Sequence, residues 1–324
     1  MHNYKIQTPI AFFIYNRSEC TARVLKEIAH VKPAKLLIIA DGPKEEQRGD
    51  YVNCTETRAI IETNIDWPCD VMMNYSSENL GCKIRLSSGL DWVFNNVEEA
   101  IILEDDCLPH PTFFRFCDEM LAYYRGDERI KVISGNNFQH GNKRTKYSYY
   151  FSRYVHIWGW ASWSQAWQNY DVEMRLWPII RDNGWLEDIL IDAKAIKYWT
   201  DIFQSVYQGE IDTWDYQWVF ACWVQNGMSI LPNVNLVSNI GFTPGSTHTT
   251  NAKNIYANLP LEAMDFPIQH PPFVIRDSHM DDFTQNTHYN RYKIFARTRG
   301  KIRELSKKKF EFIDNKTHSS DQID

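Results

Sequence analysis

The sequence predicts an α/β fold built on a mostly parallel, Rossmann-like sheet flanked by helices. Short continuous apolar runs recur along the first 137 residues, helical patterns separate them, and a turn or a polar residue follows each run. This alternation is typical of βαβ units, in which helices cover the faces of parallel strands. With 324 residues and 44% hydrophobic content the chain can bury a large core, so we expect a single main domain.

The first βα unit begins at "TPIAFFIY" (8–15), a continuous apolar run typical of a buried parallel strand. Ser18 is expected to cap a helix that continues to about His30. The run "KLLIIA" (35–40) gives a second strand, and the turn-forming "DGP" ends it.

The same alternation continues toward the middle of the chain. The expected elements are a helix around 52–64, a strand at 69–76, a helix at about 82–94, a strand at 100–106, a helix near 112–125 and a strand at 130–134. In open α/β sheets ligands bind at the carboxyl ends of the strands. The polar residues that follow the strands are therefore the first candidates for a functional site.

The clearest of these candidates is the acidic triplet in "AIILEDDCLP" (100–109). Adjacent carboxylates repel one another and lose solvation near a core, so they need a positive partner. A divalent cation, Mn²⁺ or Mg²⁺, shared with a diphosphate would supply it, since these ions prefer oxygen ligands. The alternative is a purely structural acid cluster before the N-terminus of the following helix, where the helix dipole favours negative charge.

Composition excludes several other classes of protein. A formal net charge of -6 and a sequence pI near 5.9 argue against a nucleic-acid partner. The seven cysteines contain no C-x-x-C pair, which favours free thiols in a reducing compartment over a zinc site. The chain lacks G-x-G-x-x-G, Walker-type, H-E-x-x-H and G-x-S-x-G motifs. We see neither a membrane span nor a signal peptide and expect a cytoplasmic protein.

Residues 291–309 form a basic segment with nine Lys or Arg and one acid. Apolar residues recur in it at roughly helical spacing, so it could lie on an anionic membrane surface as a peripheral helix. A solvated charged tail explains the segment equally well.

Five ordered segments carry a family resemblance: "PIAFFIYNRS", "LLIIADG", "ENLGCKIRLSSGLDWVF", "AIILEDDCLPHPTFFRF" and "IKVISGNN". Together they resemble the donor half of A-type-fold glycosyltransferases, such as N-acetylglucosaminyltransferase I and related bacterial sugar transferases. The likeness covers residues 8–137 and, more loosely, 158–163 and 213–249. It implies a glycosyltransferase A-type fold, a UDP-sugar donor, and a saccharide or lipid-linked saccharide acceptor.

The resemblance implies a donor-binding half at 1–137 and an acceptor and catalytic half of the same domain at 138–285, and the local charge adds a basic C-terminal helix or tail at 286–324. Most of the twelve tryptophans fall between Trp158 and Trp218, so the acceptor half is aromatic-rich.

On the donor side the resemblance assigns roles to strand-end residues. The last acid of the triplet, Asp106, would bind the metal, and Glu104 and Asp105 would face the ribose and the sugar. Asp41 would accept from the uracil N3–H, for which a carboxylate is a suitable acceptor. Arg17 would contact the diphosphate, for which its forked donors are suited.

Lys83 would add positive charge near the donor, although an ordinary exposed helix lysine is an equally good interpretation. Trp158, Gly159 and Trp160 would form part of the sugar pocket, since an indole face packs on the apolar face of a pyranose. Tryptophans are more often buried in the core, which is the alternative here.

An inverting transfer also needs a general base for the acceptor hydroxyl. "GEIDTWDYQW" provides Asp212 and Asp215, and the family pattern favours Asp215 without excluding Asp212. One of the residues Asp212 and Thr213 could instead cap the helix that follows. His248, in the loop "GFTPGSTHT", is a further candidate for the metal or the phosphate, or an ordinary surface histidine.

The sequence therefore predicts a metal-dependent, inverting glycosyltransferase, with a role in cell-surface polysaccharide biosynthesis. Two other functions stay open: a non-catalytic carbohydrate-binding module and a sugar-nucleotide pyrophosphorylase.

Overall fold

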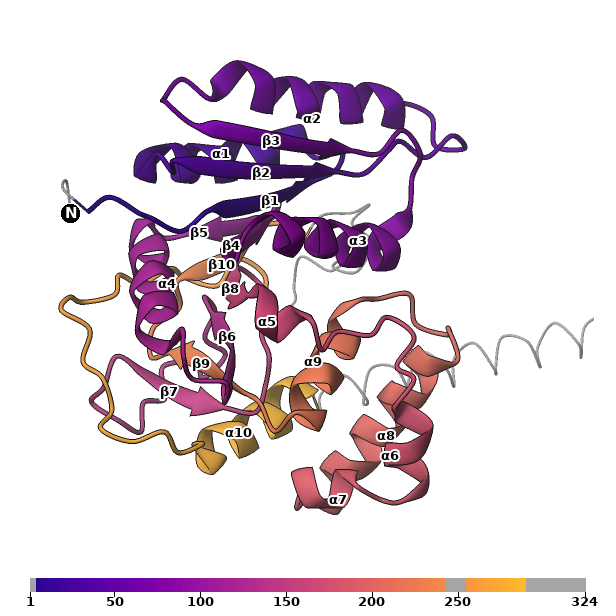
Figure 1. The fold of residues 1–324 in the computed structure, drawn as a ribbon, viewed down its shortest axis with the longest axis vertical. Coiled ribbons are helices and arrows are strands. Elements are labelled where there is room, and N and C mark those ends of the chain that lie inside the picture. The colour runs from indigo at the N-terminus through magenta and orange to yellow at the C-terminus, as the bar shows by residue number, and fades with distance from the viewer. Residues whose placement is uncertain (1–3, 243–254, 290–324) are drawn as a thin grey trace, which may run out of the picture.

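The structure is a computed structural model that describes residues 4–242 and 255–289. Its centre is an eight-stranded sheet with the strand order β3-β2-β1-β4-β8-β6-β9-β7, and a two-stranded sheet pairs β10 with β5. The strands β3, β2, β1 and β4 are all parallel. Beyond them β8 runs antiparallel to both β4 and β6, so the second half of the sheet is mixed. The predicted α/β class is confirmed (Figure 1).

The first half of the chain alternates strands and helices as expected. Its elements are β1 (Ile10–Ile14), α1 (Ser18–Val31), β2 (Lys35–Ala40), α2 (Asp50–Asn64), β3 (Asp70–Tyr75), α3 (Gly81–Asn96), β4 (Glu99–Glu104), β5 (Cys107–Pro109), α4 (Pro111–Tyr124) and β6 (Ile130–Ser134). The expected cap at Ser18 is wrong, because Ser18 is the first helical residue and Arg17 holds the N-cap position without a side-chain cap bond. The short strand β5 was not predicted.

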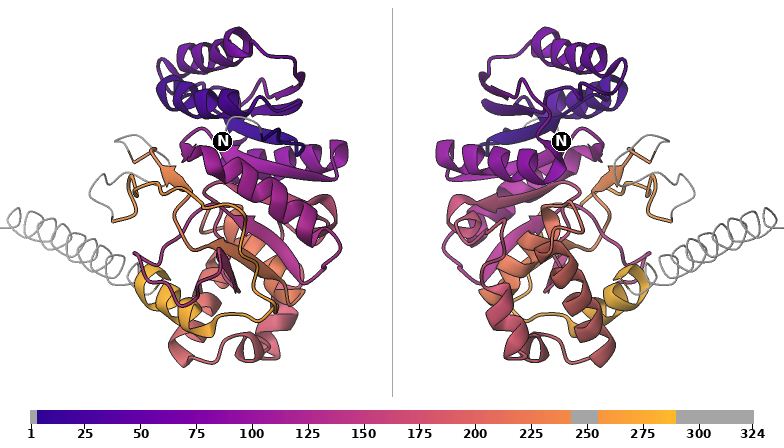
Figure 2. Two further views of the ribbon diagram at one scale, coloured as in Figure 1. Left: turned by 90° about the vertical axis from the view of Figure 1, so that its left-hand side faces the viewer. Right: turned by 90° about the vertical axis from the view of Figure 1, so that its right-hand side faces the viewer.

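The second half is less regular. Its elements are β7 (Tyr149–Ser152), β8 (Trp160–Trp163), α5 (Ser164–Trp167), α6 (Trp177–Asp182), α7 (Leu186–Ile189), α8 (Ala193–Tyr207), α9 (Asp215–Val224), β9 (Met228–Pro232), β10 (Val237–Asn239), α10 (Ser278–Thr284) and the π-helix η1 (Gln285–Tyr289). Figure 2 shows the first strands at one end of the molecule and the helices α6 to α8 at the other. Within the described residues, no helix is both long and apolar enough to cross a bilayer.

Two hydrophobic clusters cover the two faces of the sheet. In β1, Ile10, Phe12 and Ile14 belong to one cluster, and Ala11 and Phe13 to the other. This alternation follows from the two-residue repeat of a strand, and it explains why a strand buried on both faces reads as a continuous apolar run.

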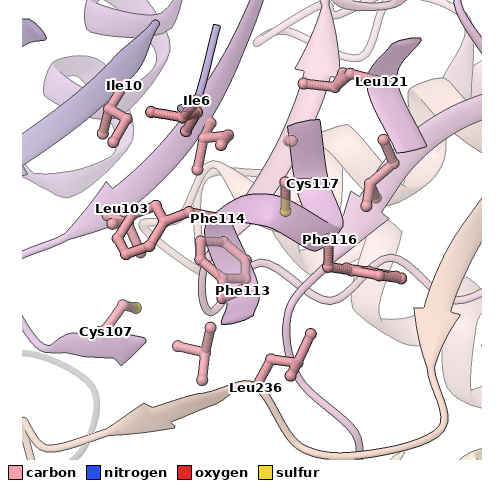
Figure 3. Close-up of a cluster of buried hydrophobic side chains, with 14 of the residues drawn as sticks. Ile6, Ile10, Leu103, Cys107, Phe113, Phe114, Phe116, Cys117, Leu121 and Leu236 are labelled. Atoms are coloured by element: carbon pink, nitrogen blue, oxygen red, sulfur yellow. The ribbon is translucent and has the colours of Figure 1, made fainter. Parts of the chain in front are cut away.

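The two clusters differ in the helices that complete them. The first is completed by α1, α2 and α4, and in Figure 3 the α4 rings Phe113, Phe114 and Phe116 lie near Leu103 and Leu236. The second is completed by α3, α8 and α9 and contains most of the buried tryptophans. The aromatic residues of the second half therefore mostly build a core, as the alternative interpretation of them proposed.

Candidate active site

A cavity of about 430 Å³ opens at the edge of the sheet where β1, β4 and β6 end. Its walls come from segments far apart in sequence. The lining residues include Arg17, Cys82, Glu104, Asp106, Asn136, Phe138, His156, Trp158, Thr213, Asp215, Tyr216, Asn239, His288 and Tyr289. Of the residues proposed from sequence, Arg17, Glu104, Asp106, Trp158 and Asp215 are brought together here.

The sheet register explains how three strands contribute to one cavity. Trp160 at the start of β8 pairs with Ile102 of β4 on one side and with Ser134 of β6 on the other. Glu104 and Asn136 each follow this row by two residues, and Trp158 precedes it by two. Because β8 runs antiparallel to β4 and β6, all three residues lie on the same side of this row, toward the edge at which β4 and β6 end. All three line the cavity.

The acidic residues are paired with one guanidinium. Arg17 Nη1 lies 2.5 Å from Asp106 Oδ2 and 3.4 Å from Asp105 Oδ1. The backbone N–H of Tyr15 also donates to Asp105 Oδ2, at 3.1 Å. Arg17 is therefore the positive partner that the acidic triplet was expected to need.

The charges do not balance, because three carboxylates share one guanidinium. Burial, followed by the neighbouring Asp106 and Asp105, raises the pKa of Glu104. Burial also raises the pKa of Asp105, although Arg17 opposes the shift. The edge therefore favours additional positive charge, either as protons or as a cation.

Asp50, which sequence reasoning missed, holds the loop that carries Arg17. Its side chain is fully buried and accepts hydrogen bonds from Tyr15 Oη at 2.5 Å and Asn16 Nδ2 at 2.5 Å. It also accepts from the backbone N–H of Lys44 at 2.7 Å. The loops after β1 and β2 are thus tied to the N-terminus of α2. No local pattern marks this role, because Asp50 follows a glycine in an ordinary acidic turn.

Gly241 lies directly against the ion pair. A Cβ atom at this position would collide with the Asp106 carboxylate and would lie 2.8 Å from Arg17 Nη1. The backbone N–H of Ile240 donates to the Asp106 carbonyl at 2.8 Å, which keeps this segment against the acids. Glycine is needed here for close approach of the backbone.

Asp41 has its carboxylate occupied within the chain. Oδ1 accepts from the backbone N–H groups of Gly42 and Leu80, both at 2.9 Å, and Oδ2 accepts from Gly81 N–H and Asn79 Nδ2, both at 3.1 Å. It joins the loop after β2 to the start of α3. Its assignment to a uracil base stays a prediction, as does that of Lys83, which is half-buried in the first turn of α3.

The "WGW" residues have three different positions. Trp158 is half-buried and lines the cavity. Gly159, with a φ of 66°, has no room for a Cβ against Val237, and its carbonyl accepts from the N–H of Gly135 at 2.7 Å. Trp160 is 1% exposed and stacks on Trp214 with ring centroids 5.9 Å apart. The structure therefore places Trp160 in the core beneath the cavity rather than in its wall.

Of the two candidates for the general base, one lines the cavity and the other is not among its described lining residues. Asp215, the first residue of α9, lines the cavity, and Thr213 Oγ1 donates to its Oδ1. Asp212 is not among the described residues of the lining. The expectation that Asp212 or Thr213 caps α9 is wrong, because Trp214 is the N-cap residue and makes no side-chain cap bond.

Whether a divalent cation fits this cavity depends on the oxygen ligands that its lining residues provide. Glu104 and Asp106 provide the carboxylate oxygens that Mn²⁺ or Mg²⁺ prefers, and the local excess of negative charge favours such an ion. Among the described residues, however, no group of three or more His, Cys, Asp and Glu side chains is arranged to hold a metal. Two carboxylates would suffice where phosphates and water complete the shell, as is usual for Mg²⁺. His248 and the basic segment 291–309 lie outside the described residues.

Two further residues of the cavity carried no signal in the sequence. Asn136 follows β6 in "SGNN", and His156 precedes β8. Both are buried, and both have a polar atom without a hydrogen-bond partner in the described part of the chain. Their importance depends on the placement of β8 between β4 and β6, which no local pattern predicts.

Comparison with known proteins adds little to this geometry. No protein-family model matches the chain, and no curated protein matches it. Among solved structures it is similar to the mannosyltransferase PcManGT from Pyrobaculum calidifontis in complex with GDP-Man and Mn²⁺. The two are 13% identical with a TM-score of 0.34, and the match covers 49% of this chain and 45% of that one. A likeness that spans less than half of each chain assigns no ligand to this cavity.

Proposed function

We propose that this protein is a metal-assisted glycosyltransferase that moves a sugar from a nucleotide-sugar, with UDP as the nucleotide, to a hydroxyl group of a saccharide. One observation carries the proposal. A single cavity at the carboxyl edge of an α/β sheet brings together Arg17, Glu104 and Asp106 from the first half of the chain and Trp158 and Asp215 from the second. The sequence resemblance supports UDP, and the basic segment 291–309 motivates a cell-surface glycan as the acceptor.

The donor would lie with its diphosphate toward the acidic edge. Arg17 provides guanidinium N–H donors at this edge, and such groups bind phosphate oxygens well. A divalent ion held by Asp106 and Glu104 would offset the charge of the departing nucleoside diphosphate. The Trp158 ring would pack on the apolar face of the sugar.

The acceptor hydroxyl would be activated from the opposite wall. Asp215 is positioned at the start of α9, with Thr213 fixing one of its carboxylate oxygens. In an inverting transfer it would take the hydroxyl proton as the acceptor oxygen bonds to the anomeric carbon and the bond to the diphosphate oxygen breaks. Asp215 is therefore our candidate for the base.

The proposal is tested by nucleotide-sugar binding and turnover. Thermal shifts of the full chain would be measured with UDP-sugars and GDP-sugars, with and without Mn²⁺, because a ligand that binds only the folded state raises the melting temperature. We expect UDP-sugars to stabilise the protein more strongly with Mn²⁺. With an oligosaccharide mixture as acceptor we expect release of UDP.

The matched variant is Asp106→Asn, which keeps the side-chain shape and removes the charge. It should lose the Mn²⁺-dependent stabilisation and the release of UDP. Full activity in Asp106→Asn would exclude the metal-assisted mechanism. Glycan affinity without any release of nucleotide would favour the carbohydrate-binding module, and pyrophosphate release from a nucleoside triphosphate and a sugar phosphate would favour the pyrophosphorylase.

A further inference from the structure

We propose that the sugar bound in this cavity is uncharged, and that Asn136 and His156 select it by hydrogen bonds to its hydroxyl groups. The inference rests on the proposed function, since it specifies the class of sugar that the same site accepts. It depends on three properties of the β6/β8 side of the cavity: buried polar atoms without partners, a fixed backbone, and the sign of the surrounding charge.

The first property is an unusual lack of pairing. Asn136 is 0% exposed and His156 is 4% exposed, and both line the cavity. Within the described residues, Asn136 Nδ2 and His156 Nε2 have no hydrogen-bond partner. Buried polar groups are nearly always paired, because leaving one unpaired costs free energy. Hydroxyl groups of a ligand would supply both missing partners.

The orientation of the Asn136 amide does not remove this argument. Ser134 Oγ lies 3.2 Å from Asn136 Oδ1 and 2.8 Å from the His156 carbonyl oxygen. Ser134 can satisfy only one of the two amide atoms of Asn136. If the amide were turned over, the nitrogen would meet Ser134 and the oxygen would be left without a partner.

The second property is a preorganised backbone. Gly135 precedes Asn136, and its N–H donates to the Gly159 carbonyl at 2.7 Å, while its own carbonyl accepts from Leu236 N–H at 2.9 Å. A Cβ at Gly135 would meet Val237, Phe113 and the Gly159 carbonyl. Asn136 therefore extends from a segment that cannot shift without disturbing β8 and β10, so its amide is held ready for a ligand.

The third property is the charge around the site. Of the described residues that line the cavity, Arg17 is the one Lys or Arg, and it is paired with Asp105 and Asp106. Glu104 and Asp215 add two more carboxyl groups to the wall, and the raised pKa of Glu104 reflects how unfavourable further negative charge is beside it. Burial lowers the pKa of His156, so its imidazole is neutral and presents a donor at one ring nitrogen and an acceptor at the other. A sugar carboxylate would find repulsion here, whereas a hydroxyl group matches either imidazole nitrogen.

The adjacent Trp158 completes a surface for a neutral ring. It is perpendicular to Phe138, with centroids 5.2 Å apart, and to Phe242, with centroids 5.9 Å apart. These contacts hold the indole in the wall of the cavity that Asn136 also lines. An apolar face next to two hydroxyl-binding groups is the arrangement that a pyranose needs.

The test is calorimetric titration of the full chain, in Mn²⁺, with UDP, UDP-glucose, UDP-galactose, UDP-N-acetylglucosamine and UDP-glucuronate. We expect the best neutral sugar nucleotide to bind at least about tenfold more tightly than UDP-glucuronate, the cost of one unfavourable charged contact. In Asn136→Leu, which keeps the side-chain shape, the affinity for that neutral sugar nucleotide should fall about tenfold while the affinity for UDP stays unchanged.

The neighbouring Asn137 gives the matched control. It is buried too, but its Nδ2 donates to the Pro232 carbonyl at 2.6 Å and its Oδ1 accepts from Gln139 N–H at 2.8 Å. Asn137→Leu should therefore lower the melting temperature and keep the preference for the neutral sugar. Asn136→Leu should keep the melting temperature and weaken sugar binding. Should Asn136→Leu not fold, His156→Asn serves for the same comparison.

Three results would overturn the inference while leaving the proposed function intact: UDP-glucuronate binding as tightly as the best neutral sugar nucleotide, equal losses of UDP and UDP-sugar affinity in Asn136→Leu, or full sugar affinity in that variant. If neither UDP nor any sugar nucleotide binds to the unmodified protein, the proposed function fails and the inference fails with it.

Discussion

On the β1/β4 side of the cavity Arg17 forms ion pairs within the chain, whereas on the β6/β8 side two buried side chains each keep one polar atom without a partner among the described residues. Arg17 is bonded to Asp105 and Asp106. Asn136 and His156, at a similar depth, each have an unpaired polar atom within the described residues. The difference suggests a division of roles. The ion pairs of the charged side stabilise the folded chain as well as forming the proposed diphosphate site, whereas the unpaired atoms of the neutral side are available to the sugar alone.

The largest effect, on the rate of sugar transfer, should come from Asp215, which lines the cavity at the start of α9. Asp215→Asn removes the proposed base and should slow sugar transfer by about 10²- to 10⁴-fold, the usual contribution of a general base. Binding of UDP should be unchanged, which calorimetry would check. Asp212→Asn is the matched control, since Asp212 is not among the described lining residues, and it should transfer normally. A comparable loss in Asp212→Asn would reverse the assignment.

The next largest effect, on the free energy of unfolding, tests whether the ion pair on the charged side stabilises the fold. Arg17→Met leaves the buried carboxylates without their guanidinium and should lower the free energy of unfolding by about 3 kcal/mol, measured in urea. Arg125→Met removes an exposed pair with Glu99 and should cost less than about 1 kcal/mol. If the two variants lost the same stability, the ion pair at the cavity would be no more important than a surface pair.

A smaller effect is expected at Gly241, which lies against the ion pair. Gly241→Ala introduces a methyl group into the space of Asp106 and Arg17, and we expect a loss of about 2 kcal/mol in stability together with weaker binding of nucleotide. Gly126→Ala is the control, because nothing lies within 4 Å of the added methyl group. It should stay within about 0.5 kcal/mol of the parent protein in urea unfolding.

The smallest effect concerns pH. Burial acts to raise the pKa of Asp50, but hydrogen bonds from Tyr15, Lys44 N–H and Asn16 outweigh it and lower the pKa below its ordinary value. A carboxyl group with a lowered pKa contributes stability above its unfolded pKa of about 3.9, and that contribution is lost as the pH falls through the folded value. Asp50→Asn should cost about 1 kcal/mol at pH 7.

The acid limb of the stability curve provides the measurement. Below pH about 4 the unmodified protein should lose stability more steeply than Asp50→Asn, because only the parent has the group that must be protonated. Parallel curves in thermal melts from pH 7 to pH 3 would mean that Asp50 does not stabilise the loop through its charge.

Much of the first half could be predicted because its signals are local. An apolar run long enough for a strand, followed by a helical pattern, predicts a strand buried on both faces, and β1, β2 and β4 confirm this. The strand β3 was also predicted, but it lies at the end of the sheet and none of its residues is fully buried. The acids after β4 could likewise be placed at the ligand-binding edge, since parallel strands share the edge at which they end. The ends of helices were less predictable. Ser18 was expected to be the N-cap of α1 but is its first helical residue, because the N-cap position depends on backbone geometry that the residue type does not fix.

The second half could not be predicted in the same way. Trp158 and Trp160 are two residues apart in one motif, yet one lines the cavity and the other stacks on Trp214 in the core. Asp212 and Asp215 are equally acidic, and only the start of α9 distinguishes them. Aromatic and acidic residues are suited to a core, a cap or a site, so residue type alone does not decide among these positions.

The sequence by itself determined the α/β class, the order of the first elements and the acidic edge, because each follows from short-range hydrophobic patterns and from the geometry of parallel strands. The tertiary structure alone decided that β8 lies between β4 and β6, which brings Asn136 and Trp158 to the same cavity as Glu104. Strand order is set by packing between distant segments, and such contacts have no local signature in the chain.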